Sequence, residues 1–402
     1  MKLDPAAWLD RPGIKRLLNA LDGDGGPDGE GDAARIVGGA VRDLLLGEVP
    51  GDLDLATRHS PQEVIRRLEA AGIKAIPTGI EHGTITAVSS GTLIEVTTLR
   101  ADLATDGRRA TVAFTDDWQG DAARRDFTIN ALYADPFSGE LFDYFGGLDD
   151  LRDRRVRFIG EPLQRIAEDH LRILRYFRFH ARYGAGEPDP AALAACSARA
   201  NDLMALSRER IADELLKLFG LEDPTPTVAL MIEHGLFAPV IPEIAPEGAT
   251  PERLAALVDA ERQAAITPAP LRRLAALLPP DPSIADKVAA RLKLSKKARK
   301  RLGLAADRDL GRSIHSLAYR CGTEAAIDRL LLADRPVDAA TIAAWPVPSL
   351  PVGGGQLIAR GVPQGPQVAL ALKRIEQAWE VAGFPGGDAI EQLIANELSQ
   401  TS

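Results

Sequence analysis

The sequence predicts an α+β protein, in which an N-terminal head built on one mixed β-sheet is followed by an all-helical remainder. Between residues 35 and 145, short apolar runs with strand alternation exchange with stretches of helical spacing. From about residue 162 onward the strand signals vanish, and Ala and Leu recur at helical spacing between Pro and Gly breaks. At 402 residues the chain is long enough for about two to four domains.

The elements of the head follow from these patterns in order. Alternating apolar residues indicate strands at 36–37, 53–56, 74–76, 84–88 and 93–98, and a hairpin at 137–145. Helical spacing indicates helices at 40–46 and 62–71. A further helix is expected to begin after Gly120, with Asp121 as its N-cap, and to continue through the segment 121–135.

Composition indicates a globular protein, with 45% hydrophobic residues, 26% charged residues and a formal net charge of −9. The N-terminus carries no apolar signal-peptide core, and no eighteen apolar residues run together. We therefore expect a cytoplasmic location without membrane contact. The two cysteines, Cys196 and Cys321, lack C-x-x-C spacing, which fits a reducing compartment and argues against a zinc site.

Two carboxylates in the segment 35–56, RIVGGAVRDLLLGEVPGDLDLA, are the first candidates for chemistry. In an extended D-L-D-L, Asp52 and Asp54 project from one face, and the two leucines project from the other. Carboxylates on a rigid strand can bind a pair of hard divalent cations, whose shells phosphate oxygens then complete. Alone, such a pair is more often a solvated strand end.

The same segment offers a place for a phosphate group. Gly38 and Gly39 would let backbone N–H groups approach a phosphate closely, and the N-terminus of the following helix favours negative charge. Arg42 lies one turn into that helix, within reach of the same anion. The alternative for the two glycines is an ordinary turn between strand and helix.

Two later segments combine arginine with carboxylates. In RRDFTINAL, at residues 124–132, Asp126 and Asn130 lie one turn apart on the expected helix. In IAEDHLRILRYFRF, at residues 166–179, four charged residues follow at three-residue steps and would line one helix face: Asp169, Arg172, Arg175 and Arg178. Either pattern alone could be a surface salt-bridge cluster.

In combination, these motifs resemble those of a known family. G-G-x-V-R-D, followed by D-x-D ten residues after Arg42, resembles motif A of the class II nucleotidyltransferases, the CCA-adding tRNA nucleotidyltransferases and bacterial poly(A) polymerases of the DNA polymerase β superfamily. Segments 124–132 and 168–172 resemble motif B and the E-D-x-x-R motif of this family. His82-Gly83-Thr84 resembles a stretch of the CCA-adding branch, and the Gly-Arg-Arg-Phe pattern of poly(A) polymerases does not occur in the sequence.

The resemblance implies a polymerase β-like head and a set of site residues. Asp52 and Asp54 would hold two Mg²⁺ about 3.5–4 Å apart, with Glu95 on a neighbouring strand as a third catalytic carboxylate. Glu95 could instead be a solvated residue on a half-exposed strand. The implied nucleotide-binding residues are Gly38, Gly39, Arg42 and Arg125 for the triphosphate, Asp126 and Asn130 for the ribose, Asp169 and Arg172 for the base, and Arg175 and Arg178 for phosphate.

The predicted reaction is the template-independent addition of C, C and A to the 3′ end of tRNA from CTP and ATP, with release of pyrophosphate. No protein partner is implied. A poly(A) polymerase, or an enzyme that adds only C or only A, would have the same active site and stays open as an alternative. The base-reading pair and the helical remainder count against an antibiotic nucleotidyltransferase, and the Asp pair counts against an idle RNA-binding protein.

A basic run in the helical remainder is the candidate surface for RNA. Residues 287–301 carry eight Lys or Arg and no acid, and Lys296, Lys297, Arg299 and Lys300 are expected to contact phosphates of the tRNA. The alternative is a solvated helix face. We expect a catalytic head over residues 1–155, a helical neck over 156–220, and a body and tail over 221–402.

Overall fold

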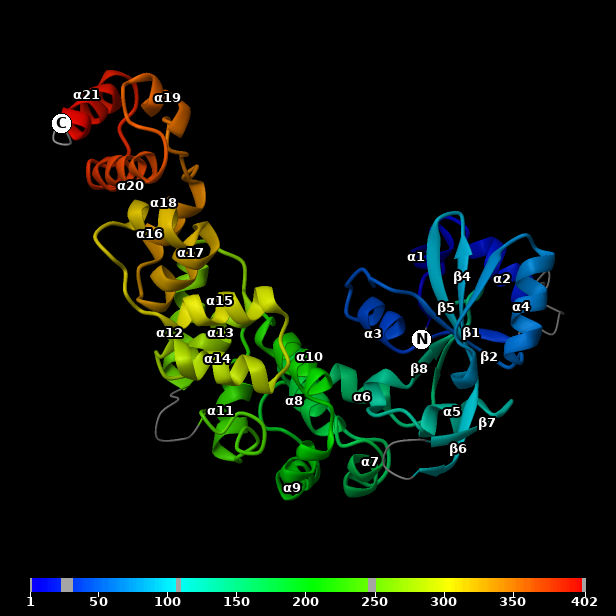
Figure 1. Ribbon diagram of the computed structural model, residues 1–402. Helices are drawn as coiled ribbons and strands as arrows, with labels where there is room; N and C mark the ends of the chain where they lie inside the picture. Colours follow the sequence, from blue (N-terminus) through cyan, green and yellow to red (C-terminus); the bar gives the residue numbers. More distant parts are fainter. Residues whose placement is uncertain (1, 23–31, 106–109, 245–250, 400–402) are drawn as a thin grey trace. The chain divides into compact units, whose positions relative to one another are not determined.

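The computed structural model describes residues 2–22, 32–105, 110–244 and 251–399 (Figure 1). The chain divides into two compact units, each of which is treated by itself. The first unit comprises Met1–Glu214 and His234–Val240, and the second comprises Leu215–Glu233 and Ile241–Ser402. All strands found in the described residues lie in the first unit, so the structure confirms the α+β class with a helical remainder. The three-part division at residues 155 and 220 stays a prediction.

The first unit is built on a seven-stranded mixed sheet with the order β3-β4-β5-β2-β1-β8-β9. Strands β2 and β5 run parallel, and the other neighbouring pairs run antiparallel. Strands β6 and β7 form a separate two-stranded sheet. The strands are β1 (Ala34–Val37), β2 (Asp54–Thr57), β3 (Lys74–Gly79), β4 (Thr84–Ser89), β5 (Thr92–Thr98), β6 (Arg100–Thr105), β7 (Ala110–Phe114), β8 (Leu132–Ala134) and β9 (Leu141–Asp143).

Helices of the first unit pack on this sheet or follow it in the chain. In α4, the Ser60 hydroxyl accepts the N–H of Glu63 and Pro61 fills the first helical position, two features that favour a helix start. The helices are α1 (Ala6–Leu9), α2 (Ile14–Asp22), α3 (Gly39–Leu45), α4 (Pro61–Ala70), α5 (Trp118–Ala123), α6 (Gly147–Arg152), α7 (Pro162–Glu168), α8 (Arg172–Tyr183) and α9 (Pro190–Ala198). Helix α10 (Arg208–Phe219) begins in the first unit and ends in the second. Short 3₁₀ turns are η1 (Ile80–His82), η2 (Thr128–Asn130) and η3 (Ala200–Ala205).

The expected helix over residues 121–135 is wrong in extent and in its cap. Asp117, not Asp121, caps helix α5, since its carboxylate accepts the N–H of Gln119 at 2.9 Å. The helix ends at Ala123, and the chain then passes through η2 into strand β8. The apolar residues of β8 are fully buried in the sheet, which explains why tertiary packing overrides the helical motif. The hairpin expected at 137–145 is consequently formed by β8 and β9.

The second unit is helical throughout its described part. Its helices are α11 (Thr225–Glu233), α12 (Pro251–Gln263), α13 (Pro270–Leu277), α14 (Pro282–Arg291), α15 (Lys296–Ala306), α16 (Ile314–Cys321), α17 (Thr323–Leu332), α18 (Pro336–Ala344), α19 (Gly354–Ala359), α20 (Pro366–Val381) and α21 (Gly387–Ser399). One core of this unit gathers around Leu257, Leu330 and Ile342, and another gathers around Ile375 and Trp379. No helix in the described residues is long and apolar enough to cross a membrane.

Candidate active site

Three carboxylates meet where β2 and β5 run side by side. Asp54 opens β2 and is the register partner of Glu95 in β5. Asp52 lies in the bend just before β2, and the chain alternates there between exposed aspartates and the buried leucines Leu53 and Leu55. This alternation is what an extended backbone gives, and it places both aspartates on one side. The expectation of a shared face is confirmed by the backbone, although the strand begins only at Asp54.

The electrostatics of Asp54 show that these carboxylates act on one another. Partial burial, the negative charge of Glu95 and that of Asp52 together raise the pKa of Asp54 to about 6, although Arg125 acts in the opposite direction. A cation would relieve this repulsion, and a set of carboxylate oxygens suits a hard divalent ion. Within the residues that the structure describes, however, no three potential metal ligands already stand close enough to form a metal cage. The carboxylates fit an open site that phosphate oxygens would complete.

The turn between β1 and α3 stands beside Arg125. Gly38 has a φ of 70°, a conformation that favours glycine, and a Cβ there would lie 3.3 Å from Nη1 of Arg125. The N–H of Gly38 donates to the carbonyl of Leu132 at 3.0 Å, so this amide already holds the turn in place. A Cβ on Gly39 would lie 3.4 Å from Arg42. The glycines therefore keep space beside two arginines, which is a structural reason for their presence.

Arg125 is positioned by Asp121 and Tyr133, two residues to which the sequence analysis assigned no place in the site. Its Nη2 donates to Asp121 and its Nε to the hydroxyl of Tyr133, each at 3.2 Å. Burial would raise the pKa of Asp121, but Arg125 and Arg124 hold it below its usual value. The carboxylate is 1% exposed, and its two arginine partners keep it ionised as a buried counter-charge. Asp121 thus directs Arg125 toward the turn at Gly38.

A second missed residue, Arg165 on α7, holds the backbone of this segment. Its Nη2 donates to the carbonyl of Arg124 at 2.5 Å and to that of Arg125 at 2.6 Å. Arg165 is 8% exposed, and such a buried guanidinium needs acceptors on several sides. In the sequence PLQRIAE, the only sign of this role is that Arg165 is a charged residue close to apolar ones.

A chain of polar and charged contacts joins α3, η2 and α8 of the first unit through Asp126, which lies in the turn before η2. Arg42 on α3 donates to Asn130 Oδ1 at 2.5 Å, and Asn130 donates to Asp126 at 3.0 Å. Arg175 on α8 then donates to the same carboxylate through Nε at 2.8 Å and Nη2 at 2.5 Å. Burial would raise the pKa of Asp126, but Arg175 and Asn130 hold it below its usual value. The structure thus brings Arg42, Asp126, Asn130 and Arg175 together in one hydrogen-bonded chain, and their contact with a nucleotide stays a prediction.

Glu214 on α10 continues this chain and was missed by the sequence analysis. Its side chain is 4% exposed and accepts Arg178 Nε at 2.6 Å, while Arg175 Nη1 lies at 3.7 Å. An unpaired buried carboxylate would be costly, so the two arginines and Glu214 stabilise one another. The sequence did carry one sign of its burial: Glu214 lies three positions after Ile211 and one before Leu215, on the apolar face of the helix. Arg175 and Arg178 are therefore each paired with a carboxylate in this structure.

Asp169 and Arg172 do not share a helix as expected. Helix α7 ends at Glu168, Asp169 has an extended backbone conformation, and α8 begins at Arg172. Asp169 accepts the N–H of Leu171 at 3.1 Å and pairs with Arg210 at 2.7 Å. The carboxylate of Asp169 competes for the backbone of the following turn, which is typical of helix starts and explains the break.

Arg172, the first residue of α8, is bound by residues of α7, which precedes the break. It donates to Glu168 and, at 2.8 Å, to the carbonyl of Arg165. Its side chain is 13% exposed. Asp169 and Arg172 are thus neighbours across a helix boundary, and each has a different partner.

In the second unit, the predicted RNA-binding residues lie at the start of α15. All four side chains are exposed: Lys296, Lys297, Arg299 and Lys300. Arg299 is paired with Asp286 on α14, through Nη2 at 2.5 Å and through Nε. The charge of Arg299 is therefore partly compensated, which distinguishes it from the three lysines.

Comparison with known protein families covers both units. Residues 34–157 match the poly A polymerase head domain, and residues 187–247 match the probable RNA and SrmB-binding site of polymerase A. Together with the mixed sheet and its paired carboxylates, the head match defines the class of protein, a nucleotidyltransferase with a polymerase β-like head.

Similarity to individual proteins indicates which branch of this class the chain resembles. The chain is 35% identical over 379 residues to human CCA tRNA nucleotidyltransferase 1, mitochondrial, with 88% of this chain and 84% of that protein covered. It is 44% identical over 186 residues to the CCA-adding enzyme of Oceanobacillus iheyensis, covering 46% of this chain and 45% of that protein. The structure resembles that of the Bacillus stearothermophilus CCA-adding enzyme in complex with CTP, at a TM-score of 0.70 and 27% identity, with 92% of this chain and 94% of that chain covered.

A further structure shares the fold. The Thermotoga maritima CCA-adding enzyme complexed with tRNA_CCA aligns at a TM-score of 0.70 and 19% identity, with 100% of this chain and 99% of that chain covered. The chain belongs to the class II family of CCA-adding tRNA nucleotidyltransferases and bacterial poly(A) polymerases.

Proposed function

We propose that this protein adds C, C and A to the 3′ end of tRNA from CTP and ATP, with release of pyrophosphate. The long match to a CCA tRNA nucleotidyltransferase supports the reaction and its substrates. The single structural observation that supports it best is the pairing of Asp54 with Glu95, beside Asp52 and in the field of Arg125. Carboxylates of this kind next to a guanidinium are suited to a metal-bound triphosphate.

We assign the catalytic centre to Asp52, Asp54 and Glu95. Asp52 and Asp54 would hold Mg²⁺, which when bound would activate the RNA 3′-hydroxyl and neutralise charge on the triphosphate. The rigid pairing of β2 and β5 would keep the carboxylates in place, so little reorganisation is needed as charge develops. Glu95 would raise the pKa of Asp54 through their mutual repulsion, which a bound cation would relieve.

The triphosphate would lie at the turn of Gly38 and Gly39, where Arg42 and Arg125 converge. Charge-assisted hydrogen bonds from guanidinium groups are among the strongest that a protein offers to phosphate. Arg125 stays directed there by Asp121 and Tyr133. Arg175 and Arg178 would contact phosphate only by sharing or exchanging their present carboxylate partners.

The ribose hydroxyls would be held by Asp126 and Asn130. Both side chains are buried and already hydrogen-bonded to each other, so their positions are fixed. A 2′-hydroxyl could donate to the remaining lone pairs of Asp126 and accept from the amide of Asn130. This arrangement would favour ribonucleotides over deoxyribonucleotides.

The base would be read by Asp169 and Arg172 at the boundary between α7 and α8. Cytosine and adenine both offer an exocyclic amine beside an unprotonated ring nitrogen, which a carboxylate and a guanidinium complement. Uracil and guanine offer a carbonyl beside a ring N–H, which mismatches both groups. Binding of a base there requires Asp169 to turn from Arg210 and Arg172 to turn from Glu168.

The exposed lysines of α15 would contact the tRNA backbone. A cytoplasmic location remains part of the proposal, supported by two free cysteines that fit a reducing compartment. The human relative is named as mitochondrial.

Single-nucleotide incorporation tests the proposal against its alternatives. Three tRNA substrates, ending before C74, after C75 and after A76, would each be incubated with CTP or ATP alone. We expect two C on the first, one A on the second and no addition on the third. Repeated addition of A to all three would instead identify a poly(A) polymerase, and addition of only one of the two nucleotides would identify a partial enzyme.

A further inference from the structure

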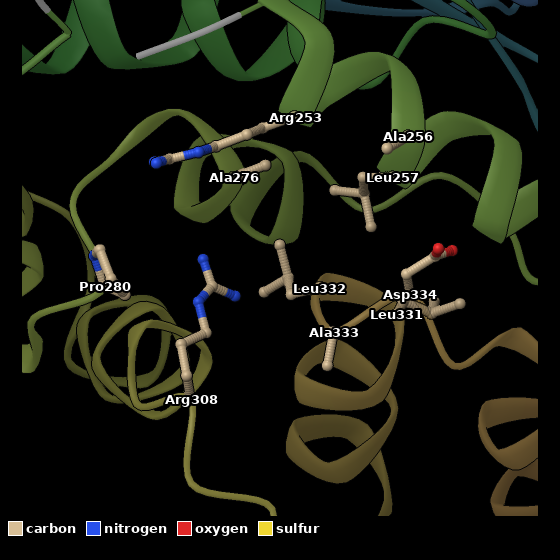
Figure 2. Close-up of a pocket in the computed structure, with 10 residues that line it drawn as sticks. All are labelled: Arg253, Ala256, Leu257, Ala276, Pro280, Arg308, Leu331, Leu332, Ala333 and Asp334. Atoms are coloured by element: carbon tan, nitrogen blue, oxygen red, sulfur yellow. The ribbon is translucent and has the colours of Figure 1, made fainter. Parts of the chain in front are cut away.

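A pocket of about 320 Å³ lies within the second unit, where α12, α13 and α17 meet the segment after α15 (Figure 2). Most of its wall is apolar and comes from small or aliphatic side chains, among them Leu257, Ala276 and Leu332. Figure 2 shows Arg308 reaching up into the cavity below Arg253. Neither the catalytic residues nor the lysines of α15 line this pocket.

The cationic side of the pocket is not compensated. Arg308 Nη2 donates to the carbonyl of Ala275 at 2.9 Å, but its Nη1 is buried and finds no hydrogen-bond partner in the described residues. Arg253 is exposed at the rim and forms no ion pair in the part of the chain that the structure describes. Burial and the like charge of Arg253 lower the pKa of Arg308 to about 10. The unpaired N–H donor of Arg308 and the positive charge of Arg253 both favour the binding of an anion between these two side chains.

The side chains that line the pocket indicate the chemical class of its ligand. A guanidinium pair suits a phosphate group, and the adjoining apolar wall suits a flat, weakly polar ring system. Asp334 stands at another part of the rim and would repel a second phosphate, while it could accept an amine of the ring. A volume of 320 Å³ is at the small end for ligand sites and cannot admit a double helix.

The position of the pocket connects it to the basic run. Arg308 follows the last residue of α15 by two positions, and α15 begins at Lys296. At about 1.5 Å per residue, the two ends of this helix lie about 15 Å apart, which is the span of a few nucleotides. A strand that contacts the lysines could therefore place a neighbouring nucleotide at the pocket.

We propose that this pocket binds one unpaired nucleotide of the tRNA, with its phosphate between Arg253 and Arg308 and its base on the wall of Leu257, Ala276 and Leu332. The proposal rests on the proposed function, because it takes tRNA as the substrate. It adds a recognition site within the second unit that reads the presence of an extruded base rather than the sequence of the 3′ end.

Equilibrium binding of the full chain to tRNA without its CCA end tests this site. Arg308→Gln removes the open donor, and Ala256→Trp fills the pocket from an exposed position on α12. Arg312→Gln is the matched control, because it removes the same charge from an exposed arginine outside the pocket wall. We expect each pocket variant to raise the Kd about tenfold and the control less than about twofold, at equal thermal stability. The kcat at saturating tRNA should stay unchanged.

Crosslinking and competition experiments then identify the ligand that occupies the pocket. A photo-crosslinking residue in place of Ala333 should react with one unpaired nucleotide of the tRNA, and excess CMP or inorganic phosphate should not protect it. Protection by free CMP at micromolar concentration would overturn the proposal in favour of a mononucleotide site. Equal effects of Arg308→Gln and Arg312→Gln, or an unchanged Kd for Ala256→Trp, would also overturn it. Incorporation by the unaltered protein is scored separately, so a failure of the proposed function is recognised by itself.

Discussion

Asp54 and Glu95, 41 positions apart in the chain, are register partners on the parallel strands β2 and β5. Neighbouring strands lie about 4.8 Å apart, so the two side chains on the same face are direct neighbours. Burial and the negative charges of Glu95 and Asp52 raise the pKa of Asp54 to about 6, although Arg125 acts in the opposite direction. This relationship locates the proposed catalytic centre at the start of β2.

We expect removal of either aspartate to abolish nucleotide incorporation. Asp52→Asn and Asp54→Asn keep side-chain size but remove the negative charge that would hold Mg²⁺, and we expect a loss of at least about 1,000-fold in kcat/KM. Glu95→Gln should lose less, because Glu95 acts on the charge of Asp54 and is not one of the two proposed Mg²⁺ ligands. Steady-state incorporation of CTP into tRNA, measured across a range of Mg²⁺ concentrations, gives these values.

Glu69→Gln provides the control, because Glu69 is an exposed acid on α4 of the same unit. It should retain full activity, and all four variants should bind tRNA like the parent. Activity within tenfold of the parent in either aspartate variant would refute the assignment of the metal ligands.

Base choice should depend on Asp169 and Arg172. A wrong base leaves buried polar groups unpaired, at about 1–3 kcal/mol for each, so removing the readers removes that discrimination. Asp169→Ala and Arg172→Ala should therefore raise the relative use of UTP and GTP about tenfold or more while lowering the overall rate. Competition between pairs of nucleotides on one tRNA measures this ratio. Arg199→Ala, at an exposed arginine after α9, should not change it; unchanged selectivity in both reader variants would make this helix boundary purely structural.

Binding of tRNA should depend on the lysines of α15 more than on the arginine beside them. Replacing Lys296, Lys297 and Lys300 with Gln should weaken binding and reduce the slope of log Kd against log salt, because fewer counterions are released. Arg299→Gln should have a smaller effect per charge, since Asp286 already compensates it. The affinity for free CTP should not change. A tRNA affinity that is equal in the triple variant and the parent would show that this run is a solvated helix face.

Stability should depend on pH through Asp22 at the end of α2. Burial raises the pKa of Asp22 to about 6, although its Oδ1 accepts the N–H groups of Ala33 and Ala34. The unfolded chain titrates near about 3.9, so the folded state binds more protons between about pH 4 and pH 6, and the free energy of unfolding falls as pH rises through that window.

Asp22→Asn keeps the Oδ1 acceptor and removes this titration. We expect the variant to gain about 1–2 kcal/mol over the parent between pH 4 and pH 7, less than the full two-unit value because the side chain is partly exposed. Denaturant unfolding at a series of pH values measures the difference. Parallel pH profiles for the two proteins would show that Asp22 has an ordinary pKa.

Much of the head could be predicted from sequence, because local patterns decide it. The D-L-D-L alternation indicated the shared side of Asp52 and Asp54, and the Gly38 turn was visible as a break between a strand and a helix. Helix α5 and strand β8 were not predictable, since burial of Leu132–Ala134 in the sheet overrides the helical spacing there. The break at Asp169 likewise depends on a side chain that bonds the backbone of the next turn.

Residues that support the site escaped prediction for a different reason. Arg165 and Glu214 act through long-range contacts with backbone carbonyls or arginines, and no spacing within their own helices signals those partners. Asp121 lies three and four positions before its arginine partners, so its pairing was visible as a local spacing, but its burial was not. Each is a charged residue that is buried and paired. Such residues become evident only when the elements are placed together.

The most direct test of the central claim is the sequence of the RNA that the protein makes. A tRNA without its CCA end would be incubated with the protein, Mg²⁺ and all four nucleoside triphosphates, and the products would be sequenced at their 3′ ends. We expect one dominant product that ends in CCA and is not extended further, and no product with Asp54→Asn. Products that carry runs of A, or mixtures with U and G at these positions, would contradict the proposed function.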